Sequence, residues 1–359
     1  MFLLFVRTER GEAVISLDQL SNAIHAAGFD AFAIMPATPL EKYLPVLEEA
    51  QAEKRYPAFA HPDLKKRINP QALQPSAQSV ISLAVAYYTG DAGPTPPLHG
   101  TISRSAWGRD YHKVLDERMD KVVHFLKEHC GANKCTKAVD TSFLVDRALA
   151  IEGGLGYPGS NCAVYVPPFG SWVFLGEILV DVDLSPTKKE GQDGWSCPIE
   201  CDACIRACPT QALIAPGKIK PQRCLSYLTQ TSSFPEELRE KLGTRLWGCD
   251  TCQQACPINR QVEPVSDPDF KPFVGPHVPL LSLLNMDKNE FAESFSQTSV
   301  AWRGKNILQR NACIVLGNQG NPEALDILEK TAHNHPSLAV QEAALWAITK
   351  IKRKQTNPH

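Results

Sequence analysis

Two short stretches, CPIECDACIRACP at residues 197–209 and CDTCQQACP at residues 249–257, hold seven of the chain's twelve cysteines, and Cys224 lies between them. Both stretches contain the sequence C-x2-C-x3-C-P. In bacterial ferredoxins this run, with one more cysteine upstream, supplies three thiolates to one iron–sulfur cluster and its last thiolate to a second cluster. The pattern therefore predicts a ferredoxin-like region that holds two 4Fe-4S clusters.

The ferredoxin rule assigns four thiolates to each cluster. One set is Cys197, Cys201, Cys204 and Cys256, and the other is Cys208, Cys224, Cys249 and Cys252. Cys197 and Cys201 are separated by three residues instead of two, so the loop between them has to adjust. In the second half, the remaining cysteine has moved upstream to Cys224.

Zinc and disulfides are the alternatives for clustered cysteines. Zinc ribbons also use C-x2-C pairs, but they need no third cysteine followed by proline in both halves. Disulfides are rare in the reducing cytoplasm, the compartment expected here. The other cysteines have no partner at metal-ligand spacing, and inert thiols are expected at Cys130, Cys135, Cys162 and Cys313. Clusters alone indicate electron transfer without naming its acceptor.

Length and composition limit the function in a few ways. The 359 residues suffice for two or three domains. The start, MFLLFVRTER, lacks the basic region and cleavage site of a signal peptide, so a first strand is expected there. The nearest candidate for a membrane span, VISLAVAYY at residues 80–88, is too short. A net charge of −2 gives no overall case for nucleic-acid binding, and a cytoplasmic protein is expected.

Three regions of different character follow one another, and we expect their bounds at residues 1–190, 191–265 and 266–359. The first alternates helical and strand patterns, such as a helix between Ser16 and Gly28 followed by an apolar strand, and this alternation is typical of an α/β domain. The second region holds the clustered cysteines, which predict the ferredoxin-like domain.

The third region contains two apolar helical segments, residues 301–318 and 338–351, about one repeat length apart. Stacked helix pairs of the HEAT type produce such a pattern. An all-α, HEAT-like C-terminal region is therefore expected, with an ordinary helical hairpin as the alternative.

Three features of the first region suggest chemistry. GLGYPG at residues 154–159 has the G-x-G-x-x-G form, but it follows a helix, so a glycine-rich turn is the better interpretation. The DYH sequence at residues 110–112 starts like a cobalamin-binding signature but lacks its glycine, and His112 is expected to be an ordinary helix residue. Asp140 follows a short strand and precedes a helix, so it is either a catalytic carboxylate or a helix N-cap.

Taken together, the residues resemble the epoxyqueuosine reductase family. The likeness runs along nearly the whole chain. Its longest parts are HPDLKKRINP (61–70), ISRSAWGRDYHKVL (102–115), VDTSFLVDRALA (139–150), PFGSWVFLGEIL (168–179), CDACIRACPTQALIAPGKI (201–219), RLWGCDTCQQACP (245–257) and WRGKNILQRNA (302–312).

The resemblance implies an oxidoreductase of tRNA processing that completes queuosine biosynthesis. A base-off cobalamin would lie in the cleft of the α/β domain, beside the second cluster. Electrons would pass from an external donor through both clusters to give cob(I)alamin, which opens the epoxide of epoxyqueuosine at the wobble base, and loss of water would restore the cyclopentene ring. An acid is needed on the oxygen side, because a protonated epoxide oxygen leaves more readily.

The resemblance places the acid at Asp140, whose pKa would have to rise through burial beside the apolar corrin. It implies cobalamin contacts at Arg67, Ser103, Tyr111, Asp140, Asn161, Ser171, Cys249 and Asp250. Ser103 stands where some relatives have a cysteine close to cobalt, so any role of that thiol is lost here.

The implied partners of a monomeric enzyme are tRNA, through the anticodon loop, and an external electron donor, with no membrane. The target base would be flipped into the cleft. Candidates for phosphate contacts are Arg303, Lys305, Arg310, Lys350, Lys352, Arg353 and Lys354. Two alternatives stay open: a cobalamin-dependent reductive dehalogenase, and a ferredoxin-like electron carrier with a HEAT binding module and no catalysis of its own.

Overall fold

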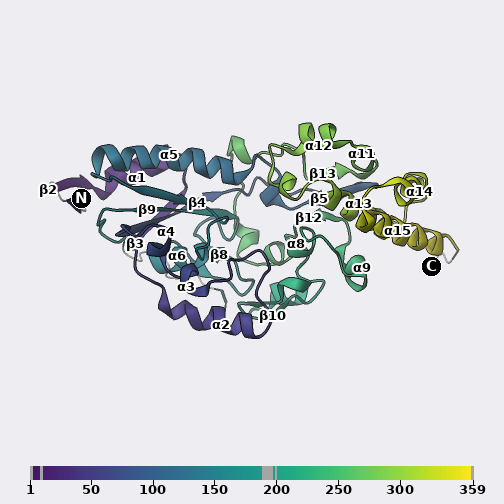
Figure 1. Ribbon diagram of the computed structural model, residues 1–359, viewed down its shortest axis with the longest axis horizontal. Coiled ribbons are helices and arrows are strands. Elements are labelled where there is room, and N and C mark those ends of the chain that lie inside the picture. The colour runs from purple at the N-terminus through teal and green to yellow at the C-terminus, as the bar shows by residue number, and fades with distance from the viewer. Residues whose placement is uncertain (1–2, 9–10, 188–196, 199, 357–359) are drawn as a thin grey trace.

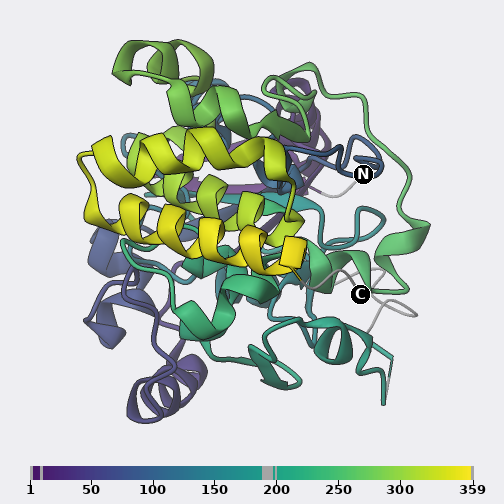
Figure 2. The same cartoon turned by 90° about the vertical axis from the view of Figure 1, so that its right-hand side faces the viewer.

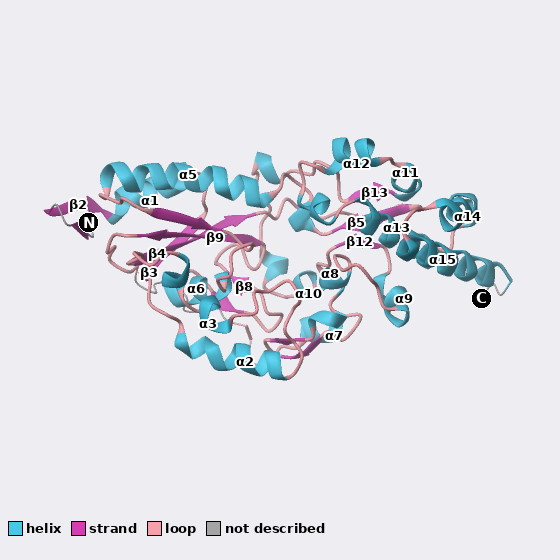
Figure 3. Ribbon diagram, in the orientation of Figure 1, coloured by secondary structure: helices cyan, strands magenta, loops and turns pink. Residues whose placement is uncertain are grey.

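The computed structural model describes residues 3–8, 11–187, 197–198 and 200–356. The molecule is elongated, with the N-terminus at one end and the C-terminal helices at the other (Figure 1). A four-stranded sheet occupies the N-terminal half, and a helical stack occupies the C-terminal half (Figure 3). The cysteine-rich segments lie between them.

The N-terminal sheet is antiparallel throughout. Its strands are β3 (Ala31–Pro36), β4 (Ser79–Ala86), β9 (Val173–Val180) and β6 (Cys135–Ala138), in that spatial order. Helices and strands alternate as expected for an α/β domain, but the strand directions differ from the parallel sheet that such alternation favours. The reason lies in pairings between segments distant in the chain: β3 pairs antiparallel with β4, and β9 inserts between β4 and β6, which run parallel to each other.

Helices cover both faces of this sheet. Helices α1 (Leu17–Ala26) and α5 (Tyr111–His129) lie on one face, and α6 (Asp146–Gly153) lies on the other (Figure 1). Every residue of β4 is buried, as expected for a central strand with both faces covered. The predicted start of α1 is confirmed, because Ser16 forms a capping box with Gln19.

Two small hairpins flank the sheet. Strands β1 (Leu3–Thr8) and β2 (Gly11–Ser16) pair with each other, so the strand expected at the start of the chain is confirmed. Strands β7 (Tyr157–Pro158) and β8 (Val164–Tyr165) pair across the glycine-rich stretch. A side chain at Gly159 would collide with the ring of Tyr165, so this stretch is a tight turn, as expected, and not a dinucleotide loop.

A second, three-stranded sheet joins distant segments. Strand β5 (His99–Ile102) pairs in parallel with β12 (Arg245–Trp247) and antiparallel with β13 (His277–Pro279). Ile102, Ala106 and Trp107 consequently belong to the same hydrophobic core as the C-terminal helices. Part of the N-terminal segment is therefore built into the other half of the molecule.

The cysteine-rich region is made of short elements. Helices α7 (Ala203–Ala207) and α10 (Thr251–Gln254) each carry the middle cysteine of one C-x2-C-x3-C run, and the two helices contact each other. The remaining elements are β10 (Leu213–Ala215), β11 (Lys218–Ile219), α8 (Leu225–Leu228) and α9 (Arg239–Leu242).

The C-terminal helices are α11 (Leu280–Asn285), α12 (Lys288–Phe295), α13 (Lys305–Gln319), α14 (Leu325–Asn334) and α15 (Leu338–Thr356). Figure 2 shows α13, α14 and α15 side by side. Helix α13 is the centre of this stack, since residues 308–317 are all buried. Its Gly317 lies against the backbone of Ala347, which allows α13 and α15 to pack closely.

Three short helices, α2 (Leu44–Ala52), α3 (Leu64–Arg67) and α4 (Pro70–Leu73), connect β3 to β4. The ion pair of Lys218 with Glu49 ties α2 to the cysteine-rich region, with the Nζ and Oε1 atoms 2.5 Å apart. Among the helices in the described ranges, none combines the length and the apolar composition needed to span a membrane.

A buried glutamate makes the stability of the N-terminal sheet depend on pH. Glu177 of β9 is fully buried, and neither of its carboxylate oxygens has a hydrogen-bond partner among the described residues. Burial, together with the nearby charges of Asp146 and Asp140, raises its pKa well above 4.5. The free energy of unfolding that protonated Glu177 contributes is complete below the pKa that this glutamate has in the unfolded chain. It falls by about 1.4 kcal/mol per pH unit as the pH rises from that value toward the pKa of Glu177 in the folded protein.

Glu177→Gln removes this titration. We expect the variant to unfold several degrees above the wild type at pH 8 and to differ much less at pH 5, as measured by thermal unfolding at both pH values. Glu293→Gln, at an exposed position of α12, is the control. A temperature difference that is the same at both pH values would contradict the titration.

Candidate functional site

Asp140 lies in the loop between β6 and α6. The strand ends at Ala138, and α6 begins at Asp146 with Val145 as its N-cap. The interpretation of Asp140 as a helix N-cap is therefore wrong. Its side chain is 47% exposed and lines a cleft, so the protein alone does not supply the burial expected for a general acid. A ligand in the cleft would have to complete it.

Two proton donors hold the Asp140 carboxylate. The Tyr111 hydroxyl donates to Oδ2, and His112 Nε2 lies 2.6 Å from Oδ1. The other ring nitrogen of His112, Nδ1, lies 2.7 Å from Oδ1 of Asp110, the N-cap of α5. Both donors thus come from the first turn of one helix, which fixes the position of the carboxylate.

The charges around His112 favour its protonated form. Burial would lower its pKa, but the hydrogen bonds and charges of Asp110 and Asp140 outweigh burial and raise the pKa to about 9. The sequence interpretation of His112 as an ordinary helix residue is therefore wrong. The signal that was available is the Asp-x-His spacing at a helix start, where an N-cap aspartate can orient the imidazole two residues later.

The cleft beside Asp140 has aromatic walls. Tyr111 stacks on Phe174 with ring centroids 4.3 Å apart. The cleft has a volume of about 240 Å³. It is lined by Tyr87, Ser105, Tyr111, Asp140, Asp146, Arg147, Ala163, Val164, Ser171, Val173, Phe174 and Leu175. Three of the predicted contact residues, Tyr111, Asp140 and Ser171, are therefore brought together here.

The floor of the cleft adjoins the cysteines. Ser171 Oγ donates to Oε1 of Gln253 at 2.8 Å, and Gln253 follows Cys252 in α10. Trp172, the next residue after Ser171, is buried, and its indole N–H has no acceptor among the described residues. Trp172 is not among the residues that line this cleft; it lines a separate cavity with Tyr88, Arg104 and Gln253.

A cavity on the other side of Gln253 brings together the second predicted set of cysteines. Cys208, Cys224, Cys249 and Cys252 all line it. The N–H of Ala212 donates to Cys208 Sγ at 3.2 Å. Burial alone would raise the pKa of Cys208, but backbone N–H groups of Leu213 and Ala212 outweigh it and lower the pKa.

The first predicted set is also largely assembled. The charges of Cys197 and Cys256 act on buried Cys204, and, after burial itself, help to raise the pKa of this thiol to about 11. Ser160 Oγ lies 3.1 Å from Cys197 Sγ. Glu200, just before Cys201, has a left-handed backbone with φ of 70°. Such a residue turns the chain sharply, which is the kind of loop adjustment that the additional residue after Cys197 requires.

All twelve cysteines are free thiols, so disulfides do not account for the clustering. Among the residues described, no three metal-binding side chains converge tightly enough to hold a single ion. The second set instead surrounds a cavity, and four thiolates around a shared space have the chemistry that an iron–sulfur cluster needs.

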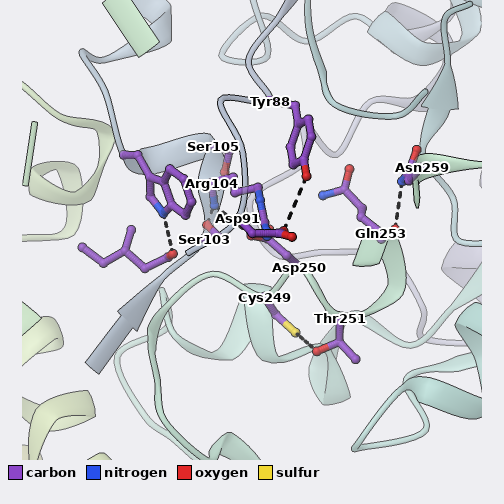
Figure 4. Close-up of polar contacts among 12 residues, drawn as sticks. Tyr88, Asp91, Ser103, Arg104, Ser105, Cys249, Asp250, Thr251, Gln253 and Asn259 are labelled. Atoms are coloured by element: carbon purple, nitrogen blue, oxygen red, sulfur yellow. Dashed lines mark hydrogen bonds and ion pairs between the residues drawn. The ribbon is translucent and has the colours of Figure 1, made fainter. Parts of the chain in front are cut away.

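The buried residue Arg104 binds the carboxylate of Asp250 (Figure 4). The backbone N–H of Arg104 donates to Asp250 Oδ2 at 2.8 Å, and its guanidinium NH1 lies 3.4 Å from the same oxygen. The guanidinium also pairs with Asp91 and lies over the ring of Trp172. Sequence reasoning missed Arg104, although it adjoins Ser103. This arginine sets the position of Asp250 beside the cluster thiolate of Cys249.

The other predicted contacts lie outside the cleft. Asn161 lines the cavity of the second cysteine set, and Ser103 lines a separate cavity with Cys249 and Asp250. Arg67 holds the Asp140 loop, because its Nε donates to the carbonyl oxygen of Phe143 at 3.2 Å.

Most of the basic residues proposed for phosphate contacts are already engaged. Arg310 is only 2% exposed and donates to the carbonyl oxygens of Thr231 and Leu228, so its assignment to phosphate is wrong. Burial lowers its pKa to about 10. Lys350 pairs with Glu240, Lys352 with Glu329, and Lys305 donates to a backbone carbonyl.

A carboxylate held by two hydrogen-bond donors, in a cleft that adjoins clustered thiols, is an arrangement that suits an iron–sulfur oxidoreductase. Residues 197–259 match a family model described as a 4Fe-4S double cluster binding domain, which confirms the cluster interpretation over zinc. Residues 67–141 match a model described as epoxyqueuosine reductase QueG, DUF1730. The chain is 38% identical to the epoxyqueuosine reductase of Bacillus subtilis over 304 residues, 82% of this chain and 76% of that protein. It belongs to the epoxyqueuosine reductase family.

Further relatives agree. The epoxyqueuosine reductase of Escherichia coli is 35% identical over 80% of this chain and 77% of its own length. A crystal structure of epoxyqueuosine reductase with an epoxyqueuosine-modified tRNA-Tyr stem loop superposes with a TM-score of 0.86 at 35% identity, covering 93% of this chain and 89% of that one. The structure of the Streptococcus thermophilus enzyme gives a TM-score of 0.87 at 30% identity, covering 95% and 91%.

Proposed function

We propose that this protein reduces epoxyqueuosine to queuosine at the wobble position of tRNA, the last step of queuosine biosynthesis. Electrons pass from an external donor through two 4Fe-4S clusters to cobalamin. The observation that carries the proposal is the placement of Asp140, with Tyr111 and His112 as its donors, in a cleft that adjoins the second set of cysteines. A dehalogenase or a non-catalytic carrier is not favoured, because relatives that match most of this chain are named epoxyqueuosine reductase.

The residues present fit both cofactors. Four thiols around one cavity suit a 4Fe-4S cluster, with Cys197, Cys201, Cys204 and Cys256 proposed for the other cluster. Base-off cobalamin would lie against Tyr111, Asp140 and Ser171 in the cleft, with Arg67, Ser103, Asn161, Cys249 and Asp250 proposed as further contacts. When bound, it supplies the low-potential nucleophile that opens the epoxide.

Asp140 acts as the acid. The overall change takes up two electrons and two protons, converts the epoxide to an alkene and releases water. Asp140 relays a proton from the protonated His112 to the epoxide oxygen as the C–O bond breaks, since an alkoxide is a poor leaving group. Tyr111 holds the carboxyl at the cleft wall, and His112 takes up the second proton of the reaction from solvent.

The rest of the chain is proposed to support this site. Residues 1–190, 191–265 and 266–359 are proposed as the cobalamin-binding, double-cluster and HEAT-like parts, with the buried apolar residues among 102–107 packed into the last core. The target base of the tRNA flips into the cleft to reach Asp140. The enzyme is proposed to work as a monomer in the cytoplasm.

The role of His112 is testable through the pH dependence of turnover. His112→Gln keeps a donor to Asp140 but removes the titrating group, so we expect turnover to fall about tenfold and its dependence on pH near 9 to disappear. Single-turnover rates between pH 7 and 10 measure both effects. His124→Gln, exposed on the same helix, is the control. An unchanged pH profile would exclude His112 from the proton path.

The function itself is tested by anaerobic reconstitution with iron, sulfide and cobalamin. An anticodon stem-loop that carries epoxyqueuosine should be converted to the queuosine form, as followed by mass spectrometry. Conversion that needs both cofactors supports the proposal. Debromination of an aryl halide with no action on the stem-loop would overturn it in favour of a dehalogenase.

A further inference from the structure

Aromatic side chains from three distant segments meet on the surface outside the cleft. Phe59 is 47% exposed and Trp302 is 56% exposed, and their ring centroids lie 5.7 Å apart. Tyr227 of α8 lies below them, 4.8 Å from the ring of Phe59. Single exposed apolar residues are common, but rings that converge from residues 59, 227 and 302 form a defined surface. We call Phe59, Trp302 and Arg303 the aromatic platform.

The platform is held in place by hydrogen bonds. Trp302 Nε1 donates to Oε1 of Gln230 at 3.1 Å, and Arg303 Nε donates to the carbonyl oxygen of the same glutamine at 2.7 Å. The Arg303 guanidinium lies over the rings of Trp302 and Phe59, 4.8 Å and 5.5 Å from their centroids. The rings are therefore fixed while their outer faces stay open to solvent.

The platform is connected to the loop that carries Asp140. The segment that contains Phe59 continues to His61, whose ring lies 5.6 Å from that of Phe143. Tyr56 donates to the carbonyl oxygen of His61 at 2.5 Å and accepts a hydrogen bond from Arg67, which also binds Phe143. Residues 56–67 thus bridge the platform and the acid.

Cations that are not engaged lie on this bridge. Lys65 and Lys66 are exposed on α3, and neither Nζ makes an ion pair within the described residues. The tail lysines Lys350 and Lys352, by contrast, are paired with glutamates. Lys65 and Lys66 therefore place free positive charge on the segment between the platform and the Asp140 loop.

We propose that Phe59 and Trp302 stack an unpaired base of the tRNA anticodon loop next to the base that enters the cleft, while Lys65 and Lys66 contact its phosphates. This inference rests on the proposed function. Flipped-out loop bases are recognised by stacking on aromatic rings and arginine planes, which are the groups present here. A partner protein would need roughly 800 Å² of surface, whereas two rings match the area of a single base.

The test measures binding of an anticodon stem-loop by fluorescence anisotropy. Trp302→Ala and Phe59→Ala should each weaken binding about tenfold, and Trp302→Phe should lose less than threefold because it keeps a ring. Phe273→Ala removes another exposed ring, 56% exposed, that lies outside the platform, and should bind like the wild type. Iron content and thermal unfolding establish that each variant is folded.

Abasic stem-loops distinguish stacking from charge. At one position of the loop, removal of the base should weaken binding to the wild type as much as Trp302→Ala does. The same abasic stem-loop should bind the Trp302→Ala protein as tightly as the intact stem-loop does. Trp302→Ala and Phe59→Ala should leave the salt dependence of binding unchanged, whereas Lys66→Gln should make it shallower.

The inference is overturned if Trp302→Ala and Phe59→Ala bind within twofold of the wild type, or if no abasic position is coupled to Trp302. Wild-type conversion of the epoxyqueuosine stem-loop in the same preparation separates the two proposals. If the wild type converts it and the platform variants bind normally, only the platform is wrong; if the wild type does not convert it, the proposed function fails.

Discussion

We expect Asp140→Asn to abolish the conversion of epoxyqueuosine while the reconstituted protein keeps both clusters and the corrin. An asparagine preserves the shape of the side chain, but its single carbonyl oxygen replaces only one of the two oxygens that accept from Tyr111 and His112, and it has no acidic proton to give. Loss of a general acid costs about 100- to 10,000-fold in rate. Single-turnover assays with the pre-reduced enzyme measure this loss without a contribution from electron delivery.

The control is a carboxylate of the same type away from the cleft. Asp120 is an exposed residue of α5 that pairs with Lys137, with Oδ1 and Nζ 2.6 Å apart. Asp120→Asn should turn over like the wild type. Full activity of Asp140→Asn would remove this residue from the chemistry, and loss of its iron or corrin would assign it a structural role instead.

Local signals in the sequence were enough to predict several elements. Ser16 and Gly28 bracket α1, and the apolar segment that follows Gly28 forms β3. The ferredoxin spacing predicted which cysteines line one cavity, because the last cysteine of a C-x2-C-x3-C run binds a different cluster from the first two. These features depend on residues that are close in the chain.

Features that depend on distant partners were not predictable. The antiparallel sheet depends on the pairing of β3 with β4 and on the insertion of β9 between β4 and β6, and no local pattern encodes these choices. Arg310 has the charge of a phosphate ligand, yet it is buried because carbonyl oxygens of the loop after α8 accept its hydrogen bonds. His112 was expected to be an ordinary helix residue because the sequence lacks the glycine of the cobalamin-binding signature. Its partner Asp140 is 28 residues away and became visible only in the structure.

The crossing of ligands between the two cysteine runs predicts a result that sequence proximity would not. Cys204 and Cys208 lie on the same run, but Cys204 is near Cys197 and Cys256, whereas Cys208 shares its cavity with Cys224, Cys249 and Cys252. We expect Cys204→Ala and Cys256→Ala to lose the same cluster and Cys208→Ala to lose the other one. Each variant should drop from about eight irons per chain to about four.

Electron paramagnetic resonance of the reduced proteins makes the assignment. Cys204→Ala and Cys256→Ala should retain one and the same cluster spectrum, and Cys208→Ala should retain the complementary one. Turnover with an external donor should be lost in all three, because each cluster is a step in the path to the cleft. Cys135→Ala, a half-buried thiol of β6 outside both sets, should keep all its iron and activity. If Cys204→Ala and Cys208→Ala kept the same spectrum, each run would bind its own cluster, and the proximity of Gln253 to Ser171 would no longer identify which cluster faces the cleft.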